Sequence, residues 1–384
     1  MDKILEDIRV LDLTHAWFGP FCTMMLSDMG AEVIKIEPPW GEQTRLQSPI
    51  HRGISTYFLY LNMGKKGIVL NLKSPRGQEI FKDLVKKSDV IVQNFSPGTM
   101  EKLGLGYEDV KKINPKIIYA SLSGFGQTGP YTRRPSYATV AEAMSGQSRM
   151  QGEQANPDGP PLNSAQAYGD LGPGLFAALS IVSALRFRDK TGKGQLIDIA
   201  QLDCMIALTP AIVGYLLTGV PTKEWRKKFP SLGVSGFLKT SDGYVAVLAP
   251  TGEMIDRLAK LLDTNNVTKE ILQKWAETKT IDEVLDALIK TDIPVSPAWG
   301  FDRVVSDPHV LARNMIVEVD HPELGKMKVP NFPIKFSESV TGVKGASPLL
   351  GQYTTEVLST VLGYSDEKIK ELEQDGAIKT AKFK

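Results

Sequence analysis

Hydrophobic positions in residues 1–122 alternate between the period of a strand and that of a helix. Short runs rich in β-formers lie at 8–13, 32–37, 68–72, 89–93 and 116–122. Helical patterns at 21–29 and 75–87 lie between them, the second with Ser74 as its expected N-cap and Pro75 at its first position. Repeated strand–helix–strand order predicts an α/β protein with a parallel sheet covered by helices.

The pattern changes along the second half of the chain. Residues 131–169 are rich in loop formers, and a helix is expected at 173–188, a strand at 194–200 and an apolar helix at 202–218. Strands at 244–248 and 294–298 flank three amphipathic helices at 252–263, 268–278 and 280–290, and helices recur over 353–374. This predicts a large domain of residues 1–218 and 330–384, a linker at 219–236, and a small α+β domain at 237–329.

Composition narrows the class of protein. The 384 residues suggest two domains, and 42% hydrophobic and 23% charged residues are ordinary globular values. A net charge of +1 without a long charge run gives no footprint of a nucleic-acid binder. Two cysteines and four scattered histidines predict no disulfide framework and no metal site. No signal-type N-terminus or long apolar run occurs, so we expect a cytoplasmic protein without a membrane segment.

Three of the expected strands end in loops rich in glycine, proline and polar residues, at 14–20, 94–98 and 123–130. Ligands of parallel sheets lie beyond these carboxyl ends. The glycines of 123–130 suit either an anion cradle or a plain turn, and no GxGxxG, P-loop or GxSxG motif is present. Five basic residues are either phosphate partners or solvated surface charges: Lys65, Lys66, Lys73, Arg76 and Lys102.

Asp170, in AYGDLGPG (167–174), is the leading candidate for chemistry. It is either the cap of the helix that follows it or a nucleophile. A carboxylate with its ordinary pKa of about 3.9 is ionised at neutral pH and needs no general base. Gly172 and Gly174 would leave room for a bulky thioester and offer backbone donors to an oxyanion.

Taken in order along the chain, several segments resemble the class III CoA-transferases. They include VLDLTHAWFGPFCTMMLSDMGAEVIKIEPPWGEQTR (10–45), NMGKKGIVLNLKSPRG (62–77), AYGDLGPGLFAALSIVSAL (167–185) and TGKGQLIDIAQLD (191–203). The resemblance implies a Rossmann-like large domain, a smaller inserted domain, and an obligate homodimer of interlocked chains. It also implies that Asp170 attacks an acyl-CoA, forming first a mixed anhydride and then an aspartyl-CoA thioester.

The same resemblance implies where coenzyme A would bind. The expected contacts are His15, Ala16, Trp17, Phe18, Leu70, Lys73, Asn94, Phe95, Ser96, Lys102 and Tyr137. Trp17 replaces the glutamine of the formyl-CoA enzymes, which predicts a more apolar or a smaller acyl site. The chain has no polyglycine stretch in 219–250 and no arginine near Pro38, where Arg45 is the expected substitute.

Rival functions stay open at this stage. An α-methylacyl-CoA racemase resembles this chain but carries a Gly-His-Asp segment where Ser136, Tyr137 and Ala138 stand here. A racemase needs a base on each side of the α-carbon. A dehydratase or lyase acting on an acyl-CoA and a non-catalytic acyl-CoA-binding protein are also compatible with the sequence. The acceptor acid is open among succinate, branched, hydroxy and aromatic acids and a betaine.

Overall fold

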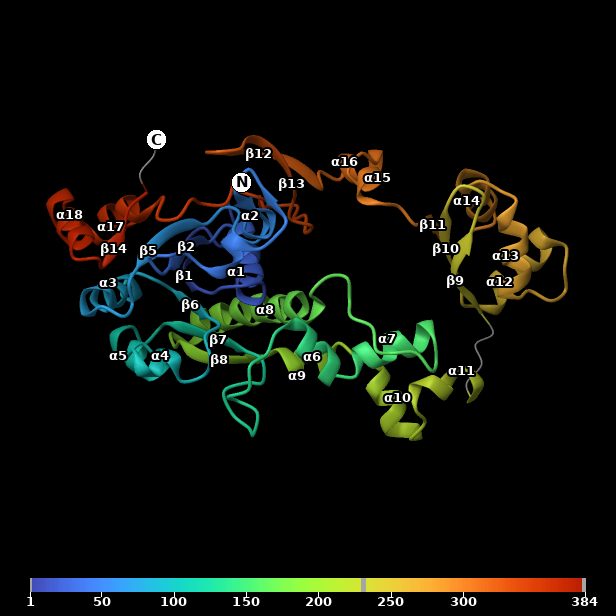
Figure 1. The fold of residues 1–384 in the computed structure, drawn as a ribbon, viewed down its shortest axis with the longest axis horizontal. Coiled ribbons are helices and arrows are strands. Elements are labelled where there is room, and N and C mark those ends of the chain that lie inside the picture. Colours follow the sequence, from blue (N-terminus) through green and yellow to red (C-terminus); the bar gives the residue numbers. More distant parts are fainter. Residues whose placement is uncertain (1, 229–232, 382–384) are drawn as a thin grey trace. The chain divides into compact units, whose positions relative to one another are not determined.

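A computed structural model describes residues 2–228 and 233–381 (Figure 1). These residues form two compact units, one of residues 1–216 and 315–384 and the other of residues 217–314. The larger unit includes the hairpin β12 (Ile316–His321) and β13 (Gly325–Pro330), which the sequence analysis placed in the small domain. Part of the expected linker, 229–232, lies outside the described residues.

A seven-stranded sheet forms the centre of the larger unit (Figure 1). Its spatial order is β14-β5-β2-β1-β6-β7-β8, and every neighbouring pair is parallel except β14 with β5. The predicted parallel sheet is therefore confirmed, and its six parallel strands have bounds within two residues of expectation, whereas the antiparallel strand β14 was not predicted. The strands are β1 Arg9–Leu13, β2 Glu32–Glu37, β5 Lys66–Leu70, β6 Val90–Gln93, β7 Ile118–Ser123, β8 Gln195–Ala200 and β14 Ile378–Lys379.

Strand order reverses between β1 and β6, because chain order proceeds outward from β1 in one direction and then from β6 in the other. Loops at such a switch point diverge above the sheet and leave a crevice for a ligand. Successive side chains of a strand point to opposite faces of the sheet, and both faces are buried here. Val10 belongs to the core on one face and Leu11 to the core on the other.

Helices cover both faces of this sheet (Figure 1). One core packs α1 (Phe18–Asp28) and α8 (Tyr168–Thr191) on the sheet, together with the β12–β13 hairpin. The other core packs α3, α5, α17 and α18 on the opposite face. Their bounds, with those of short α4, are α3 Pro75–Val85, α4 Thr99–Lys102, α5 Tyr107–Ile113, α17 Thr354–Leu362 and α18 Asp366–Gln374.

Helix α8 begins five residues earlier than the sequence pattern predicted, with Ala167 at its N-cap. Asp170 therefore lies in the first turn rather than at the cap. By length and composition α8 could cross a membrane, as could the bent pair α9 (Gln201–Ala207) and α10 (Ala211–Thr218), and half of the α8 window is buried. Its packing against α1, β7 and β8 is that of a core helix.

Three further departures from the predicted pattern occur in the larger unit. The apolar helix expected at 202–218 is two helices, α9 (Gln201–Ala207) and α10 (Ala211–Thr218), bent by 72°. Pro210 lies between them and cannot continue the helical hydrogen bonds. The stretch 131–169 contains α6 (Ala138–Met144) and α7 (Gln147–Ala155). A small subdomain between β2 and β5 consists of η1 Gln43–Leu46, β3 Ile50–His51, β4 Ile54–Ser55 and α2 Thr56–Leu61.

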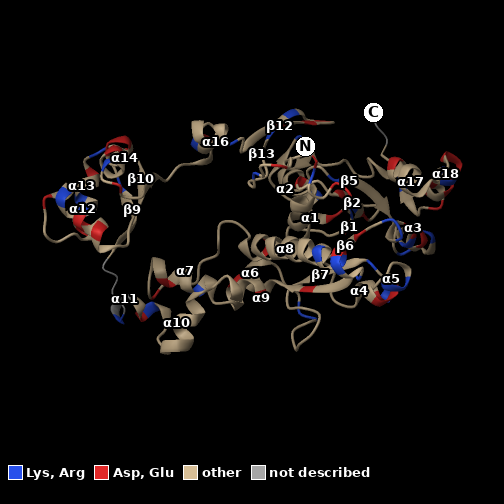
Figure 2. Cartoon of the chain, turned by 180° about the vertical axis from the view of Figure 1, so that it is seen from behind, with Lys and Arg blue, Asp and Glu red and all other residues tan. Residues whose placement is uncertain are grey.

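The unit of residues 217–314 has the predicted α+β content. A three-stranded sheet in the order β11-β10-β9 packs its own core with three helices whose capping threonines each accept a backbone N–H. Charges of both signs are mixed over these helices (Figure 2). The elements are η2 Thr222–Glu224, α11 Trp225–Lys228, β9 Val234–Lys239, β10 Tyr244–Ala249, α12 Gly252–Leu262, α13 Lys269–Glu277, α14 Ile281–Lys290, β11 Val295–Pro297, α15 Phe301–Val304 and α16 Pro308–Ala312.

Candidate active site

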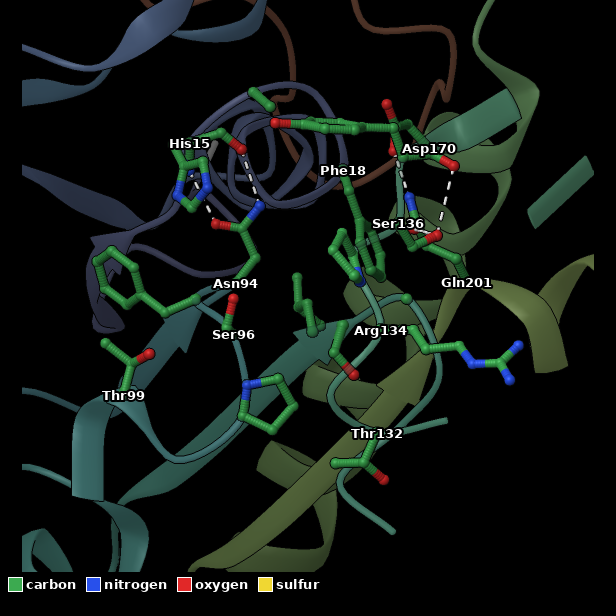
Figure 3. Close-up of a pocket in the computed structure, with 18 residues that line it drawn as sticks. His15, Phe18, Asn94, Ser96, Thr99, Thr132, Arg134, Ser136, Asp170 and Gln201 are labelled. Carbon is green, nitrogen blue, oxygen red and sulfur yellow. Dashed lines mark hydrogen bonds between the residues drawn. The ribbon is translucent and has the colours of Figure 1, made fainter. Parts of the chain in front are cut away.

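A cavity of about 350 Å³ lies beyond the carboxyl ends of β1, β6 and β7, where the strand order reverses (Figure 3). The loops predicted from the sequence form its walls, and the first turns of α8 and α9 add Asp170 and Gln201. Its lining consists of His15, Ala16, Phe18, Asn94, Phe95, Ser96, Pro97, Thr99, Leu122, Ser123, Gly124, Thr132, Arg134, Pro135, Ser136, Tyr137, Asp170 and Gln201.

The carboxyl of Asp170 is held by a short chain of hydrogen bonds. Gln201 donates from Nε2 to Oδ1 of Asp170 at 2.5 Å, and Oε1 of Gln201 accepts from the Ser136 hydroxyl at 3.1 Å (Figure 3). Because the Ser136 hydroxyl occupies the amide oxygen, the NH₂ group of Gln201 faces Asp170. Neither partner was anticipated from the sequence, although Gln201 directly follows the end of strand β8, where site residues are expected.

A second buried carboxylate lies beside Asp170. Glu142, in α6, accepts the backbone N–H of Gly169 at 2.8 Å and the Ser164 hydroxyl at 2.7 Å. Only 2% of Glu142 is exposed. A Cβ at Gly169 would lie 2.3 Å from the Ala138 carbonyl oxygen, so the glycine lets α8 start against α6. Sequence reasoning did not find Glu142, which is 27 residues from Gly169.

These surroundings change the acidity of Asp170. Burial is the main reason that its pKa rises to about 7, and the charge of Glu142 raises it further, while the Gln201 hydrogen bond works in the opposite direction. This raised pKa differs from the ordinary value of about 3.9 that the sequence analysis assumed for Asp170. A carboxylate that gains its charge in a buried place without a cation is poorly stabilised, and this makes it a stronger nucleophile.

The two glycines after Asp170 have different surroundings, and the second serves helix packing. A Cβ at Gly174 would lie 2.9 Å from the Phe21 ring and 3.0 Å from the Phe18 carbonyl oxygen, so Gly174 brings α8 close to α1. A Cβ at Gly172 would lie 2.6 Å from a methyl of Leu208. At Gly174 the prediction of room for a thioester is thus corrected, whereas at Gly172 only the end of the Leu208 side chain is near.

Buried charged residues hold the loop after β1 in place. Lys65 pairs with Asp12 at 3.0 Å, Asp12 accepts the Thr14 backbone N–H, and Lys35 donates to the Thr14 carbonyl at 3.0 Å. Ala16 has a φ of 61°, a left-handed conformation that is uncommon for alanine, and its N–H donates to Glu42. A network of this kind can maintain a strained residue at a site.

Asn94 clamps the same loop from the neighbouring strand end. Its side chain accepts the His15 N–H at 2.9 Å and donates to the His15 carbonyl at 2.8 Å (Figure 3). The His15 ring packs on Phe95 with centroids 5.5 Å apart, and burial lowers the pKa of the imidazole. Asn94 thereby shapes the cavity through the backbone of His15.

An apolar cavity of about 380 Å³ adjoins the first and shares Phe95 and Thr99 with it. It lies at the carboxyl ends of β2 and β5 and is lined by Leu13, Ile36, Glu37, Pro38, Trp40, Leu70, Asn71, Leu72, Lys73, Phe95, Thr99, Lys102 and Leu103. The structure thus brings together, over two adjoining cavities, all of the expected contacts except Trp17.

Several basic residues considered as phosphate partners are engaged elsewhere. Lys65 is fully buried against Asp12, and Lys66 pairs with Glu32 and Glu356. Arg76 pairs with Glu371 and Asp375, in α18 and at its C-cap. Arg45 makes two hydrogen bonds of 2.7 Å with Glu37 and stacks on Phe58, so its guanidinium already has a carboxylate partner. Trp40, 71% exposed and with Lys73 near its ring, lines the apolar cavity.

A third cavity of about 430 Å³ is also lined by Asp170. It shares Ala16, Tyr137 and Asp170 with the first. Its full lining is Ala16, Trp17, Gln43, Gln47, Tyr137, Ala138, Thr139, Ala167 and Asp170. The Trp17 ring packs against Tyr57 at 4.4 Å, and its indole N–H donates to the Gln47 side-chain oxygen at 3.1 Å.

The remaining sequence predictions concern sulfur and metals. Cys22 and Cys204 are free and buried, as expected. Among the described residues, no group of three or more metal-ligating side chains comes together.

Comparison with known proteins identifies relatives across almost the entire chain. Residues 5–354 match the family model described as CoA-transferase family III. The chain is 37% identical to the human succinyl-CoA:glutarate CoA-transferase, covering 98% of this chain and 90% of that protein. It is 35% identical to the formyl-CoA:oxalate CoA-transferase of Streptomyces avermitilis, covering 98% and 100%.

A solved structure agrees with these relatives. The crystal structure of a CAIB/BAIF family protein from Brucella suis superposes with a TM-score of 0.83 at 29% identity, covering 94% of this chain and 100% of that one. The carboxyl edge of the parallel sheet, the buried aspartate and the segments quoted in the sequence analysis all lie within residues 5–354, which the family model matches. The chain therefore belongs to CoA-transferase family III, and it is a CoA-transferase.

Proposed function

We propose that the protein moves coenzyme A from an acyl-CoA donor to a carboxylic acid acceptor through covalent intermediates on Asp170. The observation that carries the proposal is the position of the Asp170 carboxyl, which is buried, lines two cavities and is hydrogen-bonded to Gln201. A nucleophile that lines two cavities has room beside it for both a thiol-bearing chain and an acyl group.

In the first half-reaction, an Asp170 carboxylate oxygen attacks the thioester carbonyl carbon, the C–S bond breaks, and coenzyme A leaves as a thiolate. The product on the enzyme is a mixed anhydride of Asp170 and the donor acid. The thiolate then attacks the aspartyl carbonyl carbon, which frees the donor carboxylate and leaves an aspartyl-CoA thioester. The energy of the thioester is conserved at each step.

The acceptor carboxylate reverses these steps. It attacks the aspartyl carbonyl carbon and displaces the thiolate, forming a second anhydride. The thiolate then attacks the acceptor's carbonyl carbon, which yields the new acyl-CoA and restores the Asp170 carboxylate. The Gln201 amide, which donates to Asp170 in the free enzyme, is suited to donate to the oxygen that becomes negative when the aspartyl carbonyl is attacked.

Coenzyme A would lie across the first two cavities. The apolar lining of the second, with Trp40 and Leu72, suits the adenine, and Lys73 and Lys102 are placed for the phosphates. The narrow pantetheine arm would pass Phe95 and Ser96 and bring the thioester to Asp170.

The homodimer predicted from the family resemblance also remains a proposal. Helix α10 supports it, because none of its residues is buried within this chain and Val213, Tyr215 and Leu216 are exposed. The helix carries no charged residue (Figure 2). A second copy of the chain, wrapped around the first, would cover this apolar surface.

Rapid-quench mass spectrometry tests the mechanism. We expect a CoA-sized adduct on the peptide that contains Asp170 after mixing with a panel of acyl-CoAs, and none in Asp170→Asn. Asp203→Asn is the matched control, because Asp203 lies in the first turn of the neighbouring helix α9 and is exposed. No adduct with any donor, together with exchange of the α-proton into deuterated water, would favour a racemase and contradict the proposal.

A further inference from the structure

The Ser136 hydroxyl is connected to the proposed nucleophile through one intervening side chain. It donates to Oε1 of Gln201 at 3.1 Å, and Nε2 of Gln201 donates to Oδ1 of Asp170, so the three side chains form a row (Figure 3). Of the residues that the structure describes, Gln201 alone hydrogen-bonds the Asp170 carboxyl. Whatever fixes the Gln201 amide therefore also fixes the hydrogen bonding of the nucleophile.

The Gln201 amide has two orientations with opposite chemistry. Its NH₂ end donates and its oxygen accepts, and the two ends have nearly the same shape. With NH₂ toward Asp170, the amide favours the carboxylate; reversed, it presents an oxygen that only a protonated carboxyl can bind. Because only 4% of Gln201 is exposed, an end of the amide without a partner is costly. The group at the far end of the amide thus determines its orientation.

That group is the Ser136 hydroxyl, which has one proton and two acceptors nearby. The amide oxygen of Gln201 is 3.1 Å from Oγ, and the backbone carbonyl oxygen of Tyr137 is 3.4 Å from it. If the amide were reversed, the hydroxyl would have to accept from it, and its proton would be left with the longer contact alone. The contacts of Ser136 therefore favour the orientation that presents NH₂ to Asp170.

Backbone packing fixes the distance between the two side chains. A Cβ at Gly124, in the loop after β7, would lie 2.2 Å from the Cβ of Ser136, so a glycine lets Ser136 approach this loop. The Gly124 carbonyl also accepts the N–H of Leu202 at 3.1 Å. The same loop residue therefore contacts Ser136 and the residue that follows Gln201.

The orientation matters because the surroundings of Asp170 oppose its negative charge. Burial and the charge of Glu142 raise the pKa of Asp170, and the Gln201 hydrogen bond opposes them. The other ionisable side chains that line the first cavity are His15, Arg134 and Tyr137. When one carboxylate oxygen attacks the thioester, the oxygen that accepts from Gln201 stays on Asp170 as the aspartyl carbonyl oxygen, and it becomes negative when that carbonyl is attacked.

We infer that Ser136 is a positioning residue of the transfer reaction, whose hydroxyl holds the Gln201 amide with its NH₂ group toward Asp170. The hydroxyl acts while the carboxylate attacks the thioester and again while the aspartyl carbonyl is attacked. This inference rests on the proposed covalent function, because Ser136 reaches the reaction only through Gln201 and Asp170.

The assay is exchange of an isotopic label between an acyl-CoA and its own free acid, so no separate acceptor has to be known. The panel is succinyl-CoA, butyryl-CoA and benzoyl-CoA. Ser136→Ala should lower kcat by about threefold to tenfold, because the donor is misoriented rather than removed. The acidic limb of its kcat/KM profile should move to higher pH, since the carboxylate loses part of its stabilisation.

Ser136→Thr keeps the hydroxyl and should keep both the kcat and the acidic limb of the parent. An increase in KM after Ser136→Ala, with kcat and the limb unchanged, would mean that the hydroxyl binds the substrate directly and would overturn the inference.

A double-mutant comparison tests whether Ser136 acts through Gln201, and it does not depend on whether threonine fits beside Gly124. In the Gln201→Leu enzyme, Ser136→Ala should change kcat by less than about twofold, because the amide that it positions is absent. Equal fold-losses of kcat in the parent and in Gln201→Leu would show that the two residues act independently, which contradicts the assigned role.

This inference and the proposed function fail in different ways. Absence of an Asp170 adduct in the parent with all three thioesters would contradict the covalent mechanism and overturn the inference with it. An adduct on Asp170 in the parent, together with a Ser136→Ala enzyme that keeps the parental kcat and acidic limb, would leave the mechanism intact and refute only the role of Ser136.

Discussion

Replacing Asp170 with asparagine should abolish CoA transfer and, at the same time, stabilise the folded protein at alkaline pH. Asparagine has nearly the same shape as aspartate and keeps an oxygen that can accept from Gln201. It removes the nucleophile and also the negative charge that is buried beside Glu142. Exchange of one carboxylate oxygen for an NH₂ group would therefore abolish activity and increase stability.

The magnitude follows from the acidity of the carboxyl. The pKa of Asp170 rises from an ordinary value of 3.8 to about 7 in the folded protein. At about 1.4 kcal/mol for each pH unit, this difference amounts to roughly 4 kcal/mol. The folded state holds the proton more tightly than the unfolded state, so stability is lost as pH rises from about 4 through about 7 and stays lost above that.

Urea unfolding at fixed protein concentration, repeated between pH 4 and pH 8, measures the effect. The free energy of unfolding of Asp170→Asn relative to the parent should grow by about 4 kcal/mol over this range. Asp203→Asn, which changes an exposed carboxylate in α9, should show no comparable gain at pH 8. A difference between Asp170→Asn and the parent that does not grow with pH would refute the argument, because it would mean that the Asp170 carboxylate is well solvated.

Three further outcomes follow from the same contacts. Glu142→Gln removes a neighbouring charge that raises the pKa of Asp170, so the acidic limb of the kcat/KM profile should move to lower pH. A limb that stays in place or moves to higher pH would count against this role of Glu142. Gln201→Leu removes the hydrogen bond that favours the charged form, so that limb should move to higher pH while kcat falls by at least about tenfold; an unchanged kcat would show that the amide has no part in the reaction. Lys65→Met leaves Asp12 buried without its partner and should cost about 3–5 kcal/mol in urea unfolding at pH 7, whereas a neutral result would mean that water reaches Asp12.

Local sequence patterns were sufficient to predict the central parallel sheet of this protein. The parallel strands could be located because each is a short buried run bounded by helical periodicity, and both signals lie within a few residues. The loops that end β1, β6 and β7 were expected to meet for a geometric reason, since the carboxyl ends of parallel strands share one edge. Asp170 stood out because a carboxyl precedes an apolar helix among glycines.

Other features depended on contacts between distant parts of the chain. Gln201 is 31 residues from Asp170, and Glu142 is 27 residues from Gly169, so no periodic pattern announces either contact. Lys65 and Arg45 are basic residues of the kind that bind anionic ligands. Each is instead paired with a carboxylate that the fold brings to it. A count of basic residues in the sequence therefore overestimates the positive charge that is available to a ligand.

The sequence by itself determined the class of sheet, the edge where the site lies and the residue proposed to carry the reaction, because these follow from local periodicity and from the chemistry of one side chain. Tertiary structure decided how acidic that residue is, which amide faces it and which cavities it lines. Those properties depend on burial and on the distance between charges, and both are set only when segments far apart in the chain pack together.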